Sequence, residues 1–335
     1  MMYMKYDIHE TDVTIEAPDG KLAGTIAIPV PPHSDAAAKH PAILLIAGSG
    51  SSDRNGNSGG IDANIYHNLS NFLISLGFVT LRYDKRGTHK SEGDFNAAGL
   101  WDLVDDAEAC LQYLKSHPNC DPENVFVLGH SEGAIFTAIL ASRNRIAGAI
   151  MLAGFADTGK VMLTCQAEQV LDELEATKGF KGFLMRLLRL IPKARKRNEA
   201  TIQQILASTE DTIKLGPATI NAKWYREHYA TSVLDYLPQM TCPVLAITGD
   251  RDIQVNPQHV HIIADLVKGP VETHIIPEMN HLLCRYTSTH TMLKLQQEYQ
   301  QLIGSPLHQE LLPLLESWLH KQLHSESTFE QEETV

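Results

Sequence analysis

The sequence predicts an α/β fold with a mostly parallel central sheet, helices on both faces of that sheet, and an inserted helical cap. Three observations support this prediction. Short apolar runs, typical of strands buried on both faces, alternate with amphipathic helical segments. This alternation stops after Phe155 and resumes at Pro243. One serine, Ser131, stands at a sharp turn between a predicted strand and a predicted helix.

The first half of the chain supplies most of the predicted strands and helices. It begins with two alternating apolar and polar stretches around a Pro-Asp-Gly-Lys turn, which indicate a hairpin. Continuous apolar runs then predict buried strands, and periodic apolar positions predict helices. The predicted strands are 12–17, 22–28, 42–47, 78–83, 125–128 and 146–153. The predicted helices are 62–76, 100–116 and 132–143.

The second half contains an interruption and then a return to the core pattern. Residues 156–236 show several helical patterns and no clear strand. Strands are predicted at 243–248 and 271–276, with helices at 257–267 and 308–323. We therefore expect a core formed by residues 1–155 and 237–324, a cap formed by 156–236, and a disordered acidic tail over 325–335.

The predicted turn at Ser131 carries the pentapeptide Gly129-His130-Ser131-Glu132-Gly133. It follows an apolar strand and precedes a helix, and the glycines allow close approach of the backbone. The helix directs its first N–H groups at the serine, where an oxyanion could form. A second Gly-x-Ser-x-Gly sequence surrounds Ser58, but a polar loop precedes it. The pattern therefore predicts Ser131, and not Ser58, as the nucleophile.

A serine nucleophile needs a base, and histidine suits that role because it titrates near neutral pH. A carboxylate is needed to orient the histidine and to stabilise its charged form. Two loops that follow later strands carry such residues: residues 249–255 contain Asp250 and Asp252, and residues 277–281 end with His281. The resulting chain order is Ser, Asp, His.

With these residues the chain resembles α/β-hydrolase-fold serine esterases, near the branch shared by bacterial acyl esterases and serine aminopeptidase-like hydrolases. The resemblance covers roughly residues 10–155 and 238–323. In that family the acid usually lies in Gly-x-x-Asp-x-x-Val, which here implies Asp252. Asp250 remains the alternative, and its other interpretation is a hydrogen bond to backbone amides of the loop. His281 matches the Asn-His pair of the family.

The resemblance also implies an oxyanion hole. Glu132 N–H, directly after the nucleophile, is one expected donor. The loop 48–54 resembles the Gly-Ser-Gly…Asp-Arg loop of these esterases and implies Ser49 N–H as the other, although Ala47 stands where the family often has histidine. Residues 84–91 resemble the family's Asp-x-Arg-Gly-x-Gly-x-Ser loop, with His89 in place of a glycine. We interpret that loop as structural support near the site.

Composition limits the other possibilities. The net charge of −12 argues against broad nucleic-acid binding and against general attraction to anionic membranes. The amino terminus lacks the apolar centre of a signal peptide, and no stretch is apolar enough to span a bilayer. Five scattered cysteines favour reduced thiols in a cytoplasmic protein. The positions of the histidines, including His259 and His261, favour no metal site, and no glycine-rich loop indicates a cofactor.

The segment from Phe180 to Arg197 combines apolar residues at helical spacing with many basic residues. The main interpretation is a cap helix that packs on the core and exposes a basic face. Two functional interpretations remain open. The helix could line an acyl-chain pocket and move as a lid. It could also contact an anionic lipid surface.

Together these features predict a serine hydrolase that cleaves small to medium carboxylic esters through an acyl-enzyme and needs no cofactor or metal. The expected partner is a small-molecule ester, without nucleic acid and without stable membrane insertion, and the oligomeric state is left open. The alternatives are an aminopeptidase or amidase, a thioesterase, and a non-catalytic ligand-binding relative.

Overall fold

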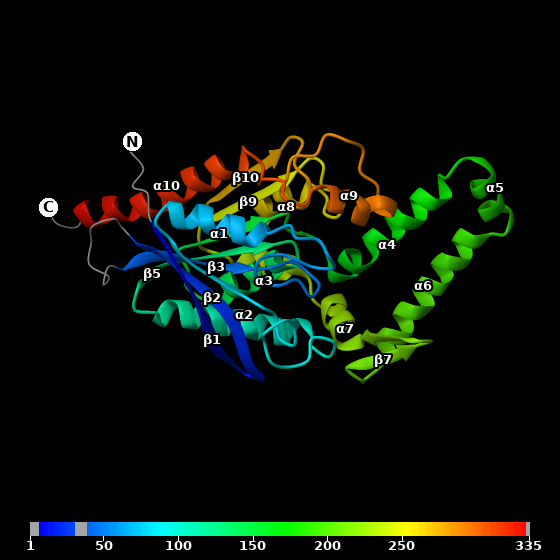
Figure 1. Ribbon diagram of the computed structural model, residues 1–335, viewed down its shortest axis with the longest axis horizontal. Helices are drawn as coiled ribbons and strands as arrows, with labels where there is room; N and C mark the ends of the chain where they lie inside the picture. Colours follow the sequence, from blue (N-terminus) through cyan, green and yellow to red (C-terminus); the bar gives the residue numbers. More distant parts are fainter. Residues whose placement is uncertain (1–6, 31–38, 333–335) are drawn as a thin grey trace.

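The computed structural model describes residues 7–30 and 39–332, and its central feature is an eight-stranded sheet (Figure 1). The strand order is β1-β2-β4-β3-β5-β6-β9-β10. The first two strands pair antiparallel with each other, and β2 pairs antiparallel with β4. The other neighbours are parallel, which confirms the predicted sheet. The strands are β1 Asp7–Ala17, β2 Gly20–Val30, β3 His40–Ile46, β4 Val79–Tyr83, β5 Cys120–His130, β6 Gly148–Leu152, β9 Val244–Gly249 and β10 Val271–Ile276.

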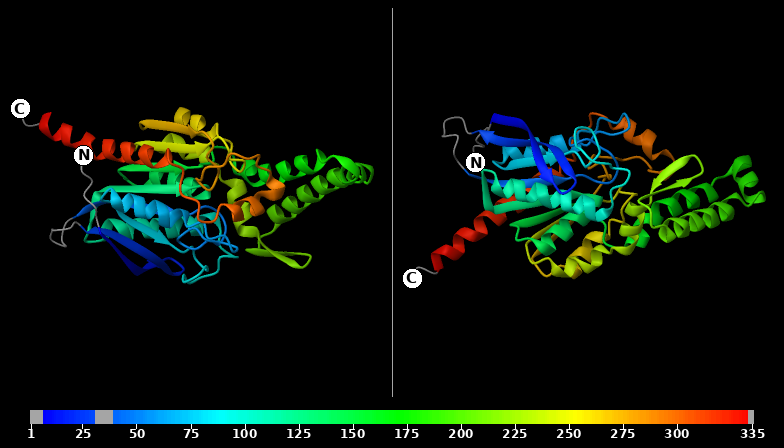
Figure 2. Two further views of the ribbon diagram at one scale, coloured as in Figure 1. Left: turned by 45° about the horizontal axis from the view of Figure 1, so that its top comes forward. Right: turned by 90° about the horizontal axis from the view of Figure 1, so that it is seen from below.

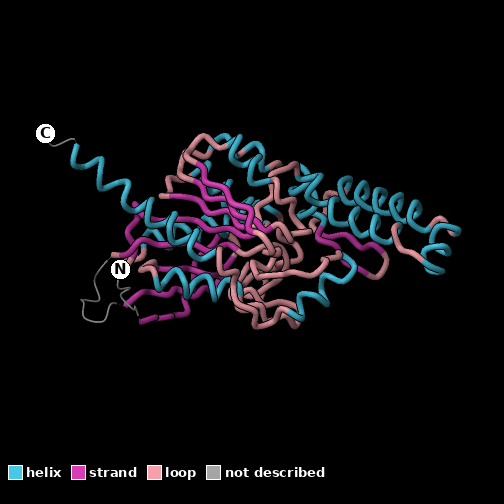
Figure 3. The backbone as a smooth tube through the Cα atoms, turned by 90° about the horizontal axis from the view of Figure 1, so that it is seen from above, coloured by secondary structure: helices cyan, strands magenta, loops and turns pink. Residues whose placement is uncertain are grey.

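Helices cover both faces of this sheet (Figures 2 and 3). Apolar side chains of α2 (Leu100–Ser116), α3 (Glu132–Arg143) and α8 (His259–Leu266) form one buried cluster with the sheet. Those of α1 (Ile65–Ser75) and α10 (Leu311–Glu332) form a second. Along β3, Leu44 belongs to the first cluster, whereas Ile43 and Leu45 belong to the second. This alternation explains why the strand is apolar at every position from Ala42 to Ile46.

Residues 156–236, which we call the helical arm, extend away from one end of the sheet (Figures 1 and 2). The loops at the carboxyl ends of the parallel strands gather between the sheet and the arm (Figure 3). The arm also contains a two-stranded hairpin, β7–β8, where the sequence indicated no clear strand. Its elements are α4 Gly159–Glu175, α5 Gly179–Leu187, α6 Leu190–Ala207, β7 Thr212–Leu215, β8 Ala218–Asn221, α7 Ala222–Ala230 and the 3-10 turn η1 Val233–Asp235.

One prediction for the arm is wrong. The apolar face of the segment that begins at Phe180 does not pack on the core, because α4 and α6 carry α5 to the far end of the arm (Figure 1). The exposed fractions are 78% for Phe180, 56% for Phe183 and 64% for Leu187. Periodic apolar spacing correctly indicated a helix, but it does not specify which surface the helix faces.

The last helix, α10, runs to Glu332 and so includes residues 325–332 of the predicted tail. Residues 325–332 continue the helix, because no glycine or proline interrupts the chain there and Glu and Gln are good helix formers. Residues 333–335 of the predicted tail lie outside the described residues. None of the described helices, α10 included, is both long and apolar enough to cross a membrane. The remaining short elements are η2 Leu237–Gln239, η3 Met292–Lys294 and α9 Leu295–Gln301.

Candidate active site

Ser131 lies at the junction of β5 and α3 with a backbone that is strained for a residue with a side chain. Its φ is 55° and its ψ is −119°, outside the regions that such residues ordinarily adopt. A Cβ on Gly129 would lie 2.1 Å from the Gly133 carbonyl oxygen, and a Cβ on Gly133 would lie 2.3 Å from that of Ile46. Neither distance is sterically possible, so this turn requires both glycines of the pentapeptide.

Ser58, the serine of the second Gly-x-Ser-x-Gly sequence, lies in a different environment. It is exposed in the loop between β3 and α1, where it forms an isolated antiparallel bridge with Ile61. It follows no strand of the central sheet directly and precedes no helix directly. The local geometry that exposes a strained nucleophile therefore exists at Ser131 and not at Ser58.

Asp252 and His281 meet at the carboxyl ends of two neighbouring parallel strands, β9 and β10. The Asp252 Oδ2 atom lies 2.7 Å from His281 Nδ1, and both side chains are buried. The other carboxylate oxygen of Asp252 accepts the N–H groups of Gln254 and Val255, at 2.9 and 3.0 Å. These bonds fix the carboxylate in place and hold the imidazole in one orientation.

Asp250, the alternative acid, has a different partner. Its Oδ1 atom accepts the backbone N–H of Glu278 at 2.7 Å. This contact joins the loop after β9 to the loop after β10, whereas the other interpretation expected an amide of Asp250's own loop. The geometry thus pairs His281 with Asp252 rather than with Asp250.

Ser131 and His281 are brought near each other without a direct bond. Among the hydrogen bonds of the described residues, none joins their side chains; catalytic bonds of this kind often shorten only when substrate binds. The link between them is His130, the residue before the serine. Its Nε2–H donates to the His281 carbonyl at 2.9 Å, and the two rings lie 4.9 Å apart.

His130 also connects to the loop that follows β3. Burial, together with the charge of His281, lowers the pKa of His130 to about 3, so its ring is neutral at physiological pH. Because Nε2 donates to a carbonyl, Nδ1 must accept, and the Tyr66 hydroxyl donates to it at 3.0 Å. The Tyr66 oxygen in turn accepts Gly48 N–H at 2.8 Å. The sequence analysis missed Tyr66 and His130, although His130 stands inside the pentapeptide.

The two expected oxyanion donors, on Ser49 and Glu132, belong to residues that line the same cavity as Ser131. Glu132 is the first residue of α3, so its N–H has no acceptor within the helix. The Lys85 ammonium donates to the carbonyls of Gly48 and, at 3.0 Å, of Gly50. In a trans peptide the C=O and the following N–H point in opposite directions, so Lys85 turns Ser49 N–H away from itself. Sequence reasoning did not identify this role of Lys85.

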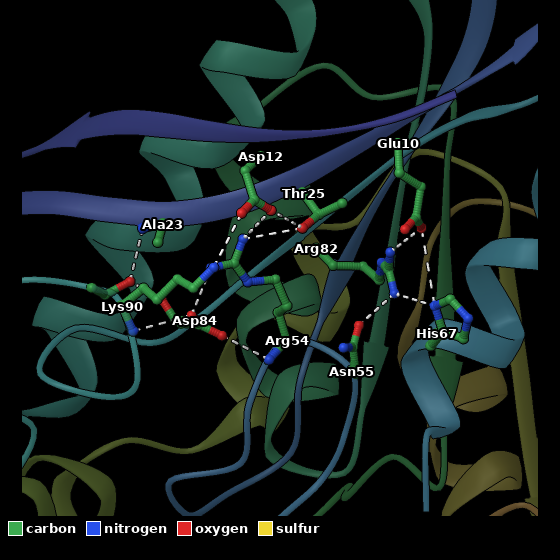
Figure 4. Close-up of polar contacts among 11 residues, drawn as sticks. Glu10, Asp12, Ala23, Thr25, Arg54, Asn55, His67, Arg82, Asp84 and Lys90 are labelled. Carbon is green, nitrogen blue, oxygen red and sulfur yellow. Dashed lines mark hydrogen bonds and ion pairs between the residues drawn. The ribbon is translucent and has the colours of Figure 1, made fainter. Parts of the chain in front are cut away.

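A polar network anchors the rest of the loop after β3 (Figure 4). Arg54 donates its backbone N–H and its guanidinium to the two carboxylate oxygens of Asp84, both at 2.8 Å. The guanidinium also donates to Thr25 at 3.0 Å. The next residue, Asn55, accepts a bond from Arg82 at 2.6 Å. These contacts agree with the prediction that the loop beginning at Asp84 supports the site.

His89 occupies the position where the resemblance expected glycine. Its φ of 45° lies in the left-handed region that favours glycine, which explains the residue type of the family. The exposed ring donates from Nε2 to the Ser51 carbonyl at 3.0 Å. This contact gives His89 a structural role in joining the two loops.

The Glu132 side chain forms a buried cluster that joins the serine turn to the arm. Its carboxylate accepts a hydrogen bond from Trp224 Nε1 at 2.9 Å. His228 Nε2 lies 2.9 Å away in ion-pair rather than linear hydrogen-bond geometry, and Lys85 Nζ lies 3.6 Å away. Burial alone would raise the pKa of Glu132, but the contacts with His228, Lys85 and Trp224 lower it to about 2. Glu132 was predicted only for its backbone, so this cluster is new.

The cavity beside Ser131 has a volume of about 200 Å³ and is closed on one side by the base of the arm. Its core lining consists of Ser49, Ser131, Glu132, Ile135, Phe155, Gln254 and Val255. Its arm lining consists of Met162, Leu163 and Gln166 from α4 and Trp224 and Tyr225 from α7. This volume lies below the usual 300–1,000 Å³ of ligand pockets, which favours a small bound group.

In the described part of the chain, no group of three or more His, Cys, Asp or Glu residues is placed to hold a metal ion. His259, one of the two closely spaced histidines, accepts the backbone N–H of Ala156 through Nδ1 at 3.1 Å. Its role is to hold the start of the arm against α8.

Comparison with known proteins places this geometry in context. The family model described as serine aminopeptidase, S33, matches residues 59–286, more than half of the chain. Esterase EstD of Thermotoga maritima is 25% identical over 276 residues, which cover 82% of this chain and 60% of the relative. The chain thus spans about 60% of the length of this curated relative.

Solved structures are similar over most of the chain. Est1E from Butyrivibrio proteoclasticus with bound ferulic acid has 17% identity and a TM-score of 0.55, and the match covers 87% of this chain and 98% of that one. The Pyrococcus furiosus esterase Pf2001 has 16% identity and a TM-score of 0.54, with 94% and 93% coverage. At these identities the likeness shows the α/β-hydrolase fold alone.

Proposed function

Because the chain belongs to the serine aminopeptidase, S33, family of α/β hydrolases, we propose that it is a serine hydrolase of small to medium carboxylic esters. The observation that carries this proposal is the buried 2.7 Å contact between His281 and Asp252 next to the strained turn at Ser131. A fixed imidazole beside a strained serine that lines a cavity is the arrangement that activates serine.

In the proposed mechanism the Ser131 hydroxyl oxygen attacks the ester carbonyl while His281 Nε2 takes its proton. Asp252 keeps the proton on Nδ1 and stabilises the imidazolium that forms. The negative charge on the former carbonyl oxygen receives hydrogen bonds from Ser49 N–H and Glu132 N–H. When the intermediate collapses, His281 returns the proton to the departing alkoxide. Water, activated by His281, then hydrolyses the acyl-enzyme and restores Ser131.

Two observations favour ester over amine-bearing peptide substrates. The relative from Thermotoga maritima is named an esterase. An aminopeptidase would also need a free anionic group to bind the substrate amine. The carboxylate of Glu132 lines the cavity, but Trp224, His228 and Lys85 already surround it. An ammonium group would have to displace one of these partners.

We also propose that the helical arm serves as the cap, with residues 1–155 and 237–324 as the core. The base of the arm supports this assignment, because Met162 and Trp224 help to enclose the cavity at Ser131. Since the cavity holds only about 200 Å³, an acyl group of a few carbons fits it best.

The test is hydrolysis of p-nitrophenyl esters from acetate to dodecanoate by the wild type and two matched variants. We expect the wild type to prefer short acyl chains and Ser131→Ala to lose activity by about 10⁴-fold or more. Ser58→Ala, which alters the second Gly-x-Ser-x-Gly sequence, keeps full activity. Thioester and p-nitroanilide analogues measured beside the esters separate the alternative hydrolases. Retained activity in Ser131→Ala, or no labelling of Ser131 by a fluorophosphonate, contradicts the proposal.

A further inference from the structure

The end of the helical arm exposes an unusual amount of apolar surface. In α5 and directly after it, apolar residues recur at the spacing of a single helix face, and they are exposed. The residues are Phe180, Phe183, Leu184, Leu187 and Leu188. A stripe of this kind is ordinarily buried, and contiguous exposed apolar surface marks a site of interaction.

The same segment is strongly basic within an acidic protein. Residues 176–198 contain eight of the 28 Lys and Arg residues of the chain and no Asp or Glu. Arg195 pairs with acidic residues of α4, and Arg186 donates to backbone carbonyls. The others form no ion pair with any described residue: Lys178, Lys181, Arg189, Lys193, Lys196 and Arg197.

The position of α5 separates it from the cavity at Ser131. Met162, near the start of α4, lines that cavity, whereas α5 follows the far end of α4 (Figure 1). The 17 residues of α4 span about 25 Å. No residue of α5 lines the cavity, so the exposed stripe does not form its acyl-binding wall in this structure.

We propose that the tip of the arm, residues 176–198, docks on the surface of an anionic phospholipid bilayer. The exposed Phe and Leu side chains insert at the boundary of headgroups and acyl chains, and the unpaired cations lie among the anionic headgroups. With nine residues, α5 is far too short to cross a bilayer, so the contact lies in the plane of the interface.

A second copy of the chain fits this surface less well. Two tips placed together would bring two sets of unpaired cations into contact. A tip placed on the acidic core of another copy would form a head-to-tail contact that does not close. Outside the tip, the other large exposed apolar residues described lie at most one to an element and form no helix face like that of α5: Ile8, Val30, Val161, Ile262, Leu293 and Ile303. A bilayer matches both the apolar and the basic features of the tip.

The test is flotation of the full chain with vesicles of phosphatidylcholine alone or with about 30% phosphatidylserine. We expect binding to the phosphatidylserine vesicles that is at least about tenfold stronger than binding to phosphatidylcholine and that weakens as salt is added. Equal binding to both vesicles, or no binding to either, overturns the proposal.

Three triple variants assign the contact. Phe180→Ser/Phe183→Ser/Leu187→Ser and Lys181→Gln/Arg189→Gln/Lys193→Gln should each reduce binding by about tenfold or more. Ile262→Ser/Leu293→Ser/Ile303→Ser removes exposed apolar residues elsewhere and should bind as the wild type does. Circular dichroism and urea unfolding show whether each variant is folded. A vesicle-free dimer that dissociates in the tip variants overturns the proposal in favour of a second copy.

Discussion

The serine turn and the tip of the arm differ in whether their charged and apolar side chains are buried and paired. Around the turn, Lys85 and Glu132 are buried and each has several polar partners. At the tip, Lys181 and Arg189 have no ionic partner among the described residues, and Phe180 is 78% exposed. Burying a charge costs free energy unless the charge is paired, so each buried charged residue at the turn requires its partners. Lys181, Arg189 and the exposed apolar residues of α5 have no such partners among the described residues, which is why we assign them to an external contact.

This difference has a mechanical consequence. At the turn, one loop is held by Lys85, Tyr66 and Arg54 together, so a change in any of them alters the geometry of the others. At the tip, α5 packs mainly along α4 and α6. Substitutions near Ser131 should therefore change activity or stability strongly, whereas substitutions of the exposed side chains of α5 should leave both nearly unchanged.

The largest expected effect is on kcat, and it distinguishes the carboxylate of Asp252 from that of Asp250. Asp252→Asn keeps the shape of the side chain but removes the acceptor that fixes the tautomer of His281, so kcat should fall by about 10⁴-fold. Asp250→Asn, the matched control, weakens the contacts with Glu278 N–H and with Arg251 and should lower kcat less than about threefold. Steady-state hydrolysis of p-nitrophenyl acetate measures both. Equal losses in the two variants would show that the hydrogen bond at 2.7 Å does not identify the acid.

Glu132→Gln should cost about 4 kcal/mol of unfolding free energy at pH 7, because Lys85 and His228 are left beside a neutral group. The sign of the pH dependence follows from the lowered pKa of Glu132. A lowered carboxyl pKa stabilises the fold above the unfolded value of 4.5, and this contribution is lost as the pH falls towards about 2.

Urea unfolding of the wild type and Glu132→Gln at pH 7, 5 and 3 tests this expectation. The difference in unfolding free energy should be constant between pH 7 and 5 and should shrink by pH 3. A control, Glu199→Gln in the exposed part of α6, should show no such change. A difference between wild type and Glu132→Gln that does not vary with pH would contradict the ionised state of Glu132.

Replacing one glycine at the turn and one at the tip by alanine compares how strongly the backbone is constrained in the two places. Gly129→Ala places a Cβ 2.1 Å from the Gly133 carbonyl oxygen and should destabilise the fold by about 3 kcal/mol. Gly179 has a φ of 78° and no atom within 4 Å of an added Cβ, so Gly179→Ala meets only the left-handed penalty of about 1 kcal/mol. Urea unfolding at pH 7 provides both values. Similar losses would mean that the turn is not sterically closed.

Lys85→Met tests whether a buried cation positions the oxyanion loop. The variant removes the donor to the carbonyls of Gly48 and Gly50, so Ser49 N–H is no longer held in one direction. We expect kcat to fall by about tenfold with little change in KM, less than the 10²–10³-fold loss of an oxyanion donor itself. Lys90→Met, on the same loop but exposed and paired only with Asp12, should be unaffected. An unchanged kcat in Lys85→Met would leave Lys85 a purely structural role.

The sequence predicted those parts of the site that depend on local backbone geometry. The strand, glycine and helix pattern located the strained Ser131, and the loops after β9 and β10 located Asp252 and His281. Lys85, Tyr66 and His130 could not be identified in this way. Their contacts join residues far apart in the chain, and one sequence gives no information on which distant polar groups meet.

In the arm, the sequence predicted helices but not which surface one of them faces. Periodicity correctly indicated helices within 156–236, but it assigned the apolar face of α5 to the core, because most amphipathic helices of globular proteins bury that face. The direction in which α4 and α6 extend is set by how the base of the arm packs on the core. No residue of α5 itself contains that information.

The smallest expected effect concerns the exposed apolar residues of α5. Phe180→Ser should change the free energy of unfolding by less than about 0.5 kcal/mol, because the ring buries little surface when the protein folds. The matched substitution Phe78→Ser, at a fully buried ring in the core, should cost about 4 kcal/mol. Urea unfolding without lipid measures both. A loss above 2 kcal/mol for Phe180→Ser would mean that the ring is buried in solution, and the tip would then have an internal partner instead of an external one.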